Sequence, residues 1–128
     1  MAIGDFDNDG AVDVLIAVND AAPLLLRNQA GKQNHWLGLK LVGKTSNPDA
    51  IGARVSYQSG DLKRSHTKVG GGSYLSAHDP RMVLGLGQRT KIDWLEVKWP
   101  RPSRAVQRFT DVPINRYITI VEGQGKWQ

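Results

Sequence analysis

The sequence contains no cysteine, which excludes disulfide bridges, thiolate metal sites and cysteine nucleophiles. This absence does not separate a reducing from an oxidising compartment. Apolar runs of the roughly 18 residues that a membrane-spanning helix needs are also missing. Residues 1–10 are acidic and lack the basic and then apolar order of a secretory signal. The 128 residues, of which 40% are hydrophobic, are typical of one folded domain or of a small domain with a fragment of another.

Positive charge is absent from the beginning of the chain. Residues 1–26 hold five Asp and no Lys or Arg, so the rest carries all 17 basic residues and seven of the 12 acidic ones, a net charge of +10. Such a division indicates two functional regions. A basic body can attract an acidic polysaccharide, a phosphate-bearing polymer or an acidic protein surface, and charge alone does not choose among them.

The acidic region is concentrated in one short loop. Residues 5–13 contain Asp5, Asp7, Asp9 and Asp13, with Gly10 placed to allow a sharp turn. Carboxylates this close repel one another, and a hard divalent cation that accepts several oxygens relieves the repulsion. The spacing therefore predicts a calcium site, to which the backbone carbonyl of Ala11 could add an oxygen.

This loop differs from an EF-hand. The twelfth loop position holds Ile16 in place of a bidentate Glu, and a strand-like sequence follows in place of a helix. The alternative to a calcium site is a solvated acidic turn that binds nothing, because Asp and Asn favour turns in any case.

Residues 4–15 resemble the FG-GAP (VCBS) repeat, in which cation loops join strands of β-propeller blades. The resemblance covers residues 2–30 and implies calcium on Asp5, Asp7, Asp9, Asp13 and the Ala11 carbonyl. Apolar runs at residues 12–18 and 24–26 predict a strand, a turn and a second strand, with no preceding strand to complete a sheet. Since a lone hairpin is marginal in water, we expect this remnant to pack on the body or to belong to a longer propeller.

The rest of the chain predicts an all-β domain. A polar linker at residues 27–34 leads into a series of short, partly alternating segments, and Pro100 ends one of them. We expect a truncated repeat and linker over residues 1–33, a compact antiparallel β-sandwich-like domain over 34–122, and a polar tail over 123–128. Strands are predicted at residues 36–42, 53–58, 61–69, 82–86, 92–99, 106–109 and 117–121.

One predicted strand carries a row of basic groups. Arg64, His66 and Lys68 recur at period two, which places them on one face of a strand and makes them a possible anion-binding surface. The alternative is a solvated edge strand that uses basic side chains to discourage aggregation.

The glycine-rich segment at residues 70–81 is distinctive, but it matches no catalytic motif. It lacks the Lys-Ser/Thr pair and the following helix of a phosphate-binding P-loop. Ser73, His78 and Asp79 are the residue types of a hydrolase triad, yet no nucleophile elbow surrounds the serine. The three histidines, His35, His66 and His78, show no metal-ligand spacing. A structural loop is the favoured interpretation.

The body resembles the ASPIC/UnbV domain, which follows FG-GAP repeats in the cartilage acidic protein family and in many bacterial secreted proteins. The resemblance covers residues 34–122, and its matching segments are residues 34–37, 51–55, 70–76, 79–81, 84–87, 95–100 and 115–117. It implies an extracellular, periplasmic or cell-surface location and supplies no catalytic residue. It also implies that this chain is the C-terminal piece of a longer protein.

The expected function is therefore a non-catalytic interaction or adhesion module, with a structural calcium ion and a protein or acidic glycan as partner. An alternative is an accessory or catalytic part of a secreted hydrolase or biosynthetic enzyme that uses His78, Asp79 or Glu96, although no nucleophile, base and orienting group are visible by spacing. Nucleic-acid binding would need exposed aromatic residues for stacking. The candidates are Trp36, Tyr57, Tyr74 and Trp94, and no RNA-binding signature accompanies them.

Overall fold

A computed structural model describes the backbone of residues 1–128 and the side chain of every residue except Ser73. The described chain is all-β, as the sequence predicts, and contains no helix. Its twelve strands are β1 (Ala2–Gly4), β2 (Asp13–Ile16), β3 (Leu24–Leu26), β4 (His35–Val42), β5 (Arg54–Ser59), β6 (Leu62–Thr67), β7 (Gly72–Ser73), β8 (Ser76–Ala77), β9 (Met82–Gly87), β10 (Trp94–Lys98), β11 (Val106–Phe109) and β12 (Tyr117–Val121). In the part of the chain that is described, no helix could cross a membrane.

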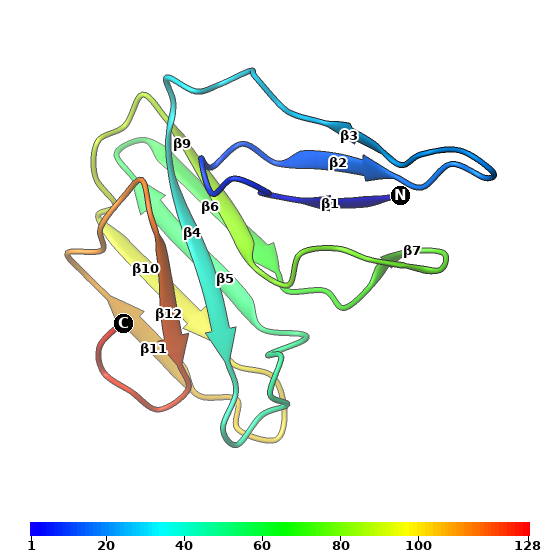
Figure 1. Ribbon diagram of the computed structural model, residues 1–128. Coiled ribbons are helices and arrows are strands. Elements are labelled where there is room, and N and C mark those ends of the chain that lie inside the picture. The colour runs from blue at the N-terminus through cyan, green and yellow to red at the C-terminus, as the bar shows by residue number, and fades with distance from the viewer.

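Two sheets form a sandwich from β4 to β12. One has the order β11-β10-β5-β6 and the other the order β12-β4-β9. Figure 1 shows the two sheets facing each other, with β4 and β12 in front of β5 and β10. Alternate residues of each strand point inward, and the fully buried side chains include Leu37, Leu39, Tyr57, Leu95 and Trp99. The observed strands of the body agree with the predicted ones to within a few residues at each end.

The sandwich is not wholly antiparallel, which corrects the expected architecture. β12 runs parallel to β4, with Ile118 opposite Leu39 and Ile120 opposite Leu41. Parallel neighbours need a long crossover. Here the whole chain between the two strands supplies it, since β11 ends the opposite sheet and residues 110–116 lead across to the free edge of β4.

The N-terminal region is a three-stranded sheet and not a hairpin. β1 precedes the acidic loop and pairs antiparallel with β2, which pairs in turn with β3. The prediction that no strand precedes the loop was therefore wrong. The strand is only three residues long, too short for alternation to reveal it. Figure 1 shows this sheet standing beside the sandwich, next to the ribbon of β7 and β8.

Two further segments differ from expectation. The glycine-rich segment forms a small antiparallel ribbon, β7–β8, where a loop was predicted. The C-terminal residues fold back as well: Gln128 exchanges two backbone hydrogen bonds with Thr119, at 2.7 and 2.9 Å, and Trp127 packs against the core. Residues 123–128 are thus not a free polar tail, because one aromatic side chain anchors them.

A buried carboxylate holds the loop after β4. Glu122 accepts hydrogen bonds from three successive backbone amides, those of Lys44, Thr45 and Ser46, at 2.7 to 2.8 Å. The Ser46 hydroxyl donates to its other oxygen at 2.9 Å. Burial alone would raise the pKa of Glu122, but hydrogen bonds from Ser103, from Ser46 and from the Lys44 amide lower it to about 2.

The depressed pKa of Glu122 gives a pH prediction. The folded state binds this proton more weakly than the unfolded state, whose group has the ordinary value of 4.5. The stabilisation is thus present above pH 4.5 and is lost as the pH falls toward 2. Glu122→Gln should lower the melting temperature at neutral pH, because an amide NH2 group would then face backbone donors.

Thermal melts from pH 7 to pH 2 check this expectation. The Glu122→Gln variant should show a shallower fall in melting temperature than the unmodified chain. Ser46→Ala should shift the acid transition to higher pH, since it removes one hydroxyl donor. Identical acid profiles for all three proteins would contradict the assignment.

Candidate metal centre

Three acidic side chains of the first loop converge. Asp5, Asp7 and Asp13 each present an oxygen that lies within 4.8 Å of the other two. Asp5 ends up there because it follows β1 directly, and Asp13 because it begins β2, so the pairing of the two strands brings them together. Asp5 is 2% exposed and Asp13 is 4% exposed, whereas Asp7 lies at the surface.

Backbone amides orient the two buried carboxylates. Asp5 accepts from the amides of Asp9 and Gly10 at 3.0 and 2.9 Å. Asp13 accepts from the amides of Phe6 and Asn28 at 3.1 and 2.8 Å. A carboxylate offers about four acceptor positions, so each retains lone pairs for a cation. The donor set is all oxygen, which suits calcium or magnesium.

Protein cations reach the surface acids of the loop but not the buried ones. Arg27 pairs with Asp7, and Lys32 lies 3.5 Å from Asp9. Among the described residues, no Lys, Arg or His side chain forms an ion pair with Asp5 or Asp13. Buried charges without a counter-ion are costly. The pair therefore has the electrostatic character of a site for a cation.

Of the five predicted ligands, three bring their carboxylates together: Asp5, Asp7 and Asp13. Asp9 stands outside the converging group, where its carboxylate accepts from the Ala11 amide at 2.9 Å. Gly10 has φ +86°, which confirms the sharp turn, and a Cβ built there would lie 2.2 Å from the ring of Trp36.

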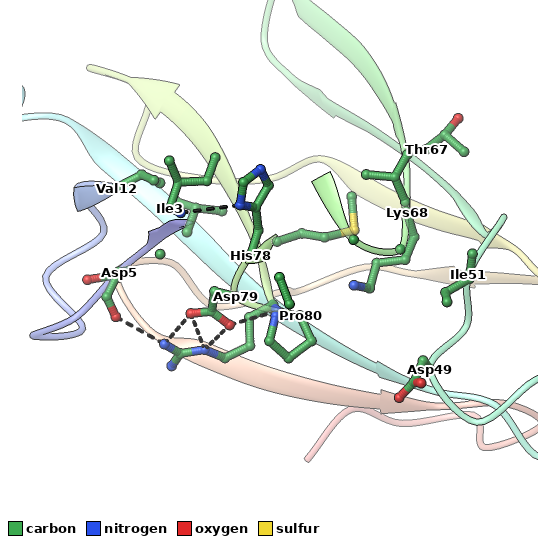
Figure 2. A pocket seen from close by; sticks show the side chains of 18 residues that line it. Ile3, Asp5, Val12, Asp49, Ile51, Thr67, Lys68, His78, Asp79 and Pro80 are labelled. Carbon is green, nitrogen blue, oxygen red and sulfur yellow. Dashed lines mark hydrogen bonds and ion pairs between the residues drawn. The ribbon is translucent and has the colours of Figure 1, made fainter. Parts of the chain in front are cut away.

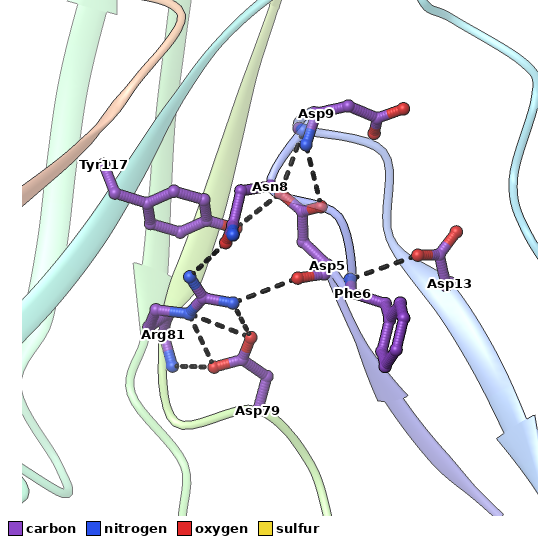
Figure 3. Close-up of polar contacts among 9 residues, drawn as sticks. Asp5, Phe6, Asn8, Asp9, Asp13, Asp79, Arg81 and Tyr117 are labelled. Atoms are coloured by element: carbon purple, nitrogen blue, oxygen red, sulfur yellow. Dashed lines mark hydrogen bonds and ion pairs between the residues drawn. The ribbon is translucent and has the colours of Figure 1, made fainter.

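The loop is attached to the sandwich by two side chains that the sequence did not single out as functional (Figure 3). The Tyr117 hydroxyl donates to Asp5 at 2.6 Å. Arg81 donates to the Asp5 carbonyl at 3.0 Å and to the Asn8 side chain at 2.6 Å, while it lies over the Tyr117 ring at 4.1 Å. Arg81 also holds Asp79 at 2.6 Å.

The contacts between the loop and the sandwich also shift the pKa values of Tyr117 and Asp79. Burial, the hydrogen bond to Asp5 and the charge of Asp5 together raise the pKa of Tyr117 well above its usual range, so the hydroxyl stays protonated and keeps donating. Burial would raise the pKa of Asp79, but the hydrogen bonds from Arg81 outweigh it and lower that pKa.

The predicted basic surface is divided. Arg64 and His66 lie opposite Tyr57 and Val55, so they share one side of β6, and both are exposed. The His66 ring stacks on Tyr57 with centroids 6.1 Å apart. Lys68 lies beyond the end of β6 and is buried at one side of the cavity that Ile3 and Ala77 also line. The expected exposed row therefore ends at His66.

The described candidate catalytic residues have other partners or lie elsewhere: His78 and Asp79 each contact another residue, and Glu96 lies on a strand of the sandwich. The Nδ1 atom of His78 accepts from the Ile3 amide at 3.3 Å, and Asp79 is held by Arg81. Glu96 belongs to β10, and the cavity beside His78 is lined by other residues. The side chain of Ser73 lies outside the described residues. The histidines are dispersed: His35 contacts Asn115 and His66 stacks on Tyr57.

A family model described as ASPIC and UnbV matches residues 43–126, about two thirds of the chain. The chain belongs to the ASPIC and UnbV family. It is also similar to cartilage acidic protein 1 of Xenopus tropicalis, with 30% identity over 125 residues, which are 93% of this chain and 19% of the relative. The mouse protein of the same name (Mus musculus) is 30% identical over 128 residues, covering 95% of this chain and 19% of the relative. The human protein (Homo sapiens) is 28% identical over 125 residues, covering 93% and 18%.

The family match confirms the resemblance of the body, and the matches to cartilage acidic protein 1 extend over most of the chain. This ASPIC/UnbV chain spans about a fifth of the length of the curated relatives it matches. The two side chains that attach the loop to the sandwich, Arg81 and Tyr117, both fall within the family segment. They also belong to the short motifs 79–81 and 115–117 that carried the resemblance, which was the available signal for them.

The contact between Tyr117 and Asp5 predicts a measurable link between loop and sandwich. Tyr117→Phe keeps the ring against Trp36 and Arg81 but removes the hydroxyl. We expect a loss of about 1.5 to 2 kcal/mol in the free energy of unfolding, typical of a hydrogen bond to a charged group. Urea unfolding at neutral pH measures it. Tyr74→Phe, at a ring that is exposed, is the control, and equal effects of the two changes would contradict the link.

Proposed function

We propose that this chain is a non-catalytic interaction module of an extracellular or cell-surface protein, in which a calcium ion fixes the N-terminal sheet to the ASPIC/UnbV sandwich. The observation that supports it is the pair of buried carboxylates, Asp5 and Asp13, with no protein cation paired to them in the described residues. Calcium would supply the missing positive charge and would do no chemistry. Asp5, Asp7 and Asp13 would hold it, with Asp9 and the Ala11 carbonyl as further candidates.

The attachments of the loop explain why such an ion would act on the whole chain. Asp5 is bonded both to its own loop and to Tyr117 of β12, so an ion bound by Asp5 stabilises the loop and its contact with the sandwich together. The N-terminal sheet is further held by Ile3, whose carbonyl accepts a hydrogen bond from the backbone amide of Asp79 at 2.9 Å. The ion is therefore proposed as a structural component of an interface.

Calcium should raise the melting temperature. Extracellular modules often bind calcium with dissociation constants of about 10⁻⁴ to 10⁻³ M. At calcium concentrations between about ten and a hundred times that constant, the expected stabilisation is about 1.4 to 2.7 kcal/mol, or several degrees. Asp5→Asn and Asp13→Asn should abolish the rise. Asp20→Asn, at an exposed acid outside the group, is the matched control.

Two more variants sharpen this test. Arg27→Gln removes the guanidinium that pairs with Asp7 and should strengthen calcium binding. Asp9→Asn decides whether the fourth carboxylate participates. If millimolar calcium leaves the melting temperature of the unmodified chain unchanged, the proposed site does not exist.

The partner is proposed to meet the N-terminal sheet. Leucines are partly exposed on both faces of this sheet, with Leu24 and Leu26 on one face and Leu15 and Leu25 on the other. Apolar groups gathered in this way mark an interaction surface. Further propeller strands of the same polypeptide suit a sheet with two apolar faces, as the resemblance to the FG-GAP repeat implies. An acidic glycan would instead meet the exposed side of Arg64 and His66.

A negative charge on the face that carries Leu24 and Leu26 tests whether the N-terminal sheet is an interaction surface. Alone in solution, the chain should self-associate through the N-terminal sheet, and Leu26→Glu should shift it toward the monomer in sedimentation velocity. Leu26 is exposed, so the variant should fold. Val106→Glu places the same charge at an exposed apolar position of the sandwich and should leave the association unchanged. Equal effects of the two variants would contradict a role for the sheet.

The enzyme and nucleic-acid alternatives receive less support. His78 and Asp79 are engaged with Ile3 and Arg81 and not with each other in any recorded contact. Of the aromatic residues that could stack on bases, Tyr57 is fully buried, and Trp94 is covered by Lys63 and Arg108 at 5.6 and 4.6 Å.

A further inference from the structure

A cavity of about 480 Å³ lies where the N-terminal sheet, the end of β6 and the β7–β8 ribbon meet. Figure 2 shows it between Ile3 and Val12 on one side and Ile51 and Lys68 on the other. Much of its wall is apolar, and its volume falls within the range of small-ligand sites. Asp5 and Val12 of the acidic loop line one side of it, and Lys68 is the basic group on the other side.

That lysine is buried without a partner. Lys68 is 7% exposed, and its ammonium group points into the cavity toward Pro80 (Figure 2). Within the described part of the chain its side chain forms no ion pair and no hydrogen bond. The stem of the side chain is buried while the ammonium group faces the cavity, so its charge is available to an anion that enters.

The backbone holds Lys68 in this position. Its amide donates to the Ala53 carbonyl at 2.7 Å, and its carbonyl accepts from the Gly52 amide at 2.8 Å. On the same wall, a Cβ at Gly70 would come within 2.7 Å of the end of the Ile51 side chain. The two backbone hydrogen bonds thus fix the Lys68 backbone beside the cavity.

The other charged residues that line the cavity are Asp5, Asp49, Asp79 and Arg81. Asp79 is paired with Arg81, whose guanidinium also reaches Asp5 and Asn8. Asp49 lines the cavity but is exposed, and no ion pair joins it to Lys68. Lys68 is therefore the cationic residue of the lining that has no ion pair in the described part of the chain, and the carboxylates of Asp5 and Asp49 disfavour a ligand with two or more negative charges.

We propose that this cavity binds a single carboxylate attached to a small apolar body, with the carboxylate on Lys68 and the body against Ile3, Ile51 and Met82. Phosphate and sulfate groups are usually held by several donors or by the guanidinium fork of arginine, and Arg81 is already engaged. The carboxylate can belong to a free carboxylic acid or to the C-terminus of a peptide. The assignment goes beyond the proposed calcium function and does not depend on it.

NMR titration of the amide resonances tests the assignment. The probes are hexanoate and the tripeptide acetyl-Ala-Val-Leu, supplied both with a free C-terminal carboxylate and as the C-terminal amide. We expect saturable shifts at Lys68, Gly70 and Gly71, with the free acid binding at least tenfold more tightly than the amide. Hexanoate binding alone would identify a free acid as the source, and binding of the peptide acid alone would identify a chain terminus.

Variants of the cavity wall complete the test. Lys68→Met should weaken binding at least tenfold, while Lys40→Met, at an exposed lysine of β4, should leave it unchanged. Val69→Glu adds a negative charge at an exposed residue of the same cavity and should also weaken binding, which keeps the test valid if Lys68→Met does not fold. Equal binding of the acid and the amide, unaltered binding in both cavity variants, tighter binding of inorganic sulfate, or no saturable shift would overturn the proposal.

Discussion

The buried carboxylate of Asp5 is the constraint on which the arrangement of the two parts depends. Amides of its own loop and the hydroxyl of Tyr117, 112 positions later in the chain, share its hydrogen-bonding capacity. Because Asp5 is hydrogen-bonded both to its own loop and to Tyr117 of the sandwich, the conformation of the loop and its contact with the sandwich are thermodynamically linked. A change that favours one of these two therefore favours the other.

The acidic N-terminal region and the basic body meet without forming ion pairs to the buried acids of the loop. The acidic loop meets the basic body through Arg81, which reaches a backbone carbonyl and an amide oxygen of the loop, while its ion pair is made with Asp79 of the body. The body thus attaches to the loop without neutralising its buried carboxylates. In the same way, Lys68 of the body is buried beside the sheet without an acidic partner from it. Opposite net charges of two regions do not imply that their charges pair.

Local sequence pattern was sufficient to predict most strands of the sandwich and the convergence of three carboxylates. Alternating segments predicted the strands of the sandwich, and the spacing of Asp5, Asp7 and Asp13 around a glycine predicted their convergence. Pattern failed where long-range pairing decides the outcome. The parallel register of β12, the three-residue β1, the burial of Lys68 and the anchoring of Trp127 all depend on neighbours distant in sequence. Tyr117 and Arg81 were visible only as parts of family motifs, because a hydroxyl and a guanidinium in a strand or turn carry no local mark of their role.

The close approach of Gly10 to Trp36 has an optical consequence. The indole of Trp36 lies against the backbone of the acidic loop at a spacing that leaves no room for a Cβ, whereas Trp94 and Trp99 belong to the opposite sheet or its end and Trp127 packs on the core. Any rearrangement of the loop changes the polarity around one ring and leaves the other three largely as they were. The chain thus contains an intrinsic fluorophore whose emission follows the state of the loop.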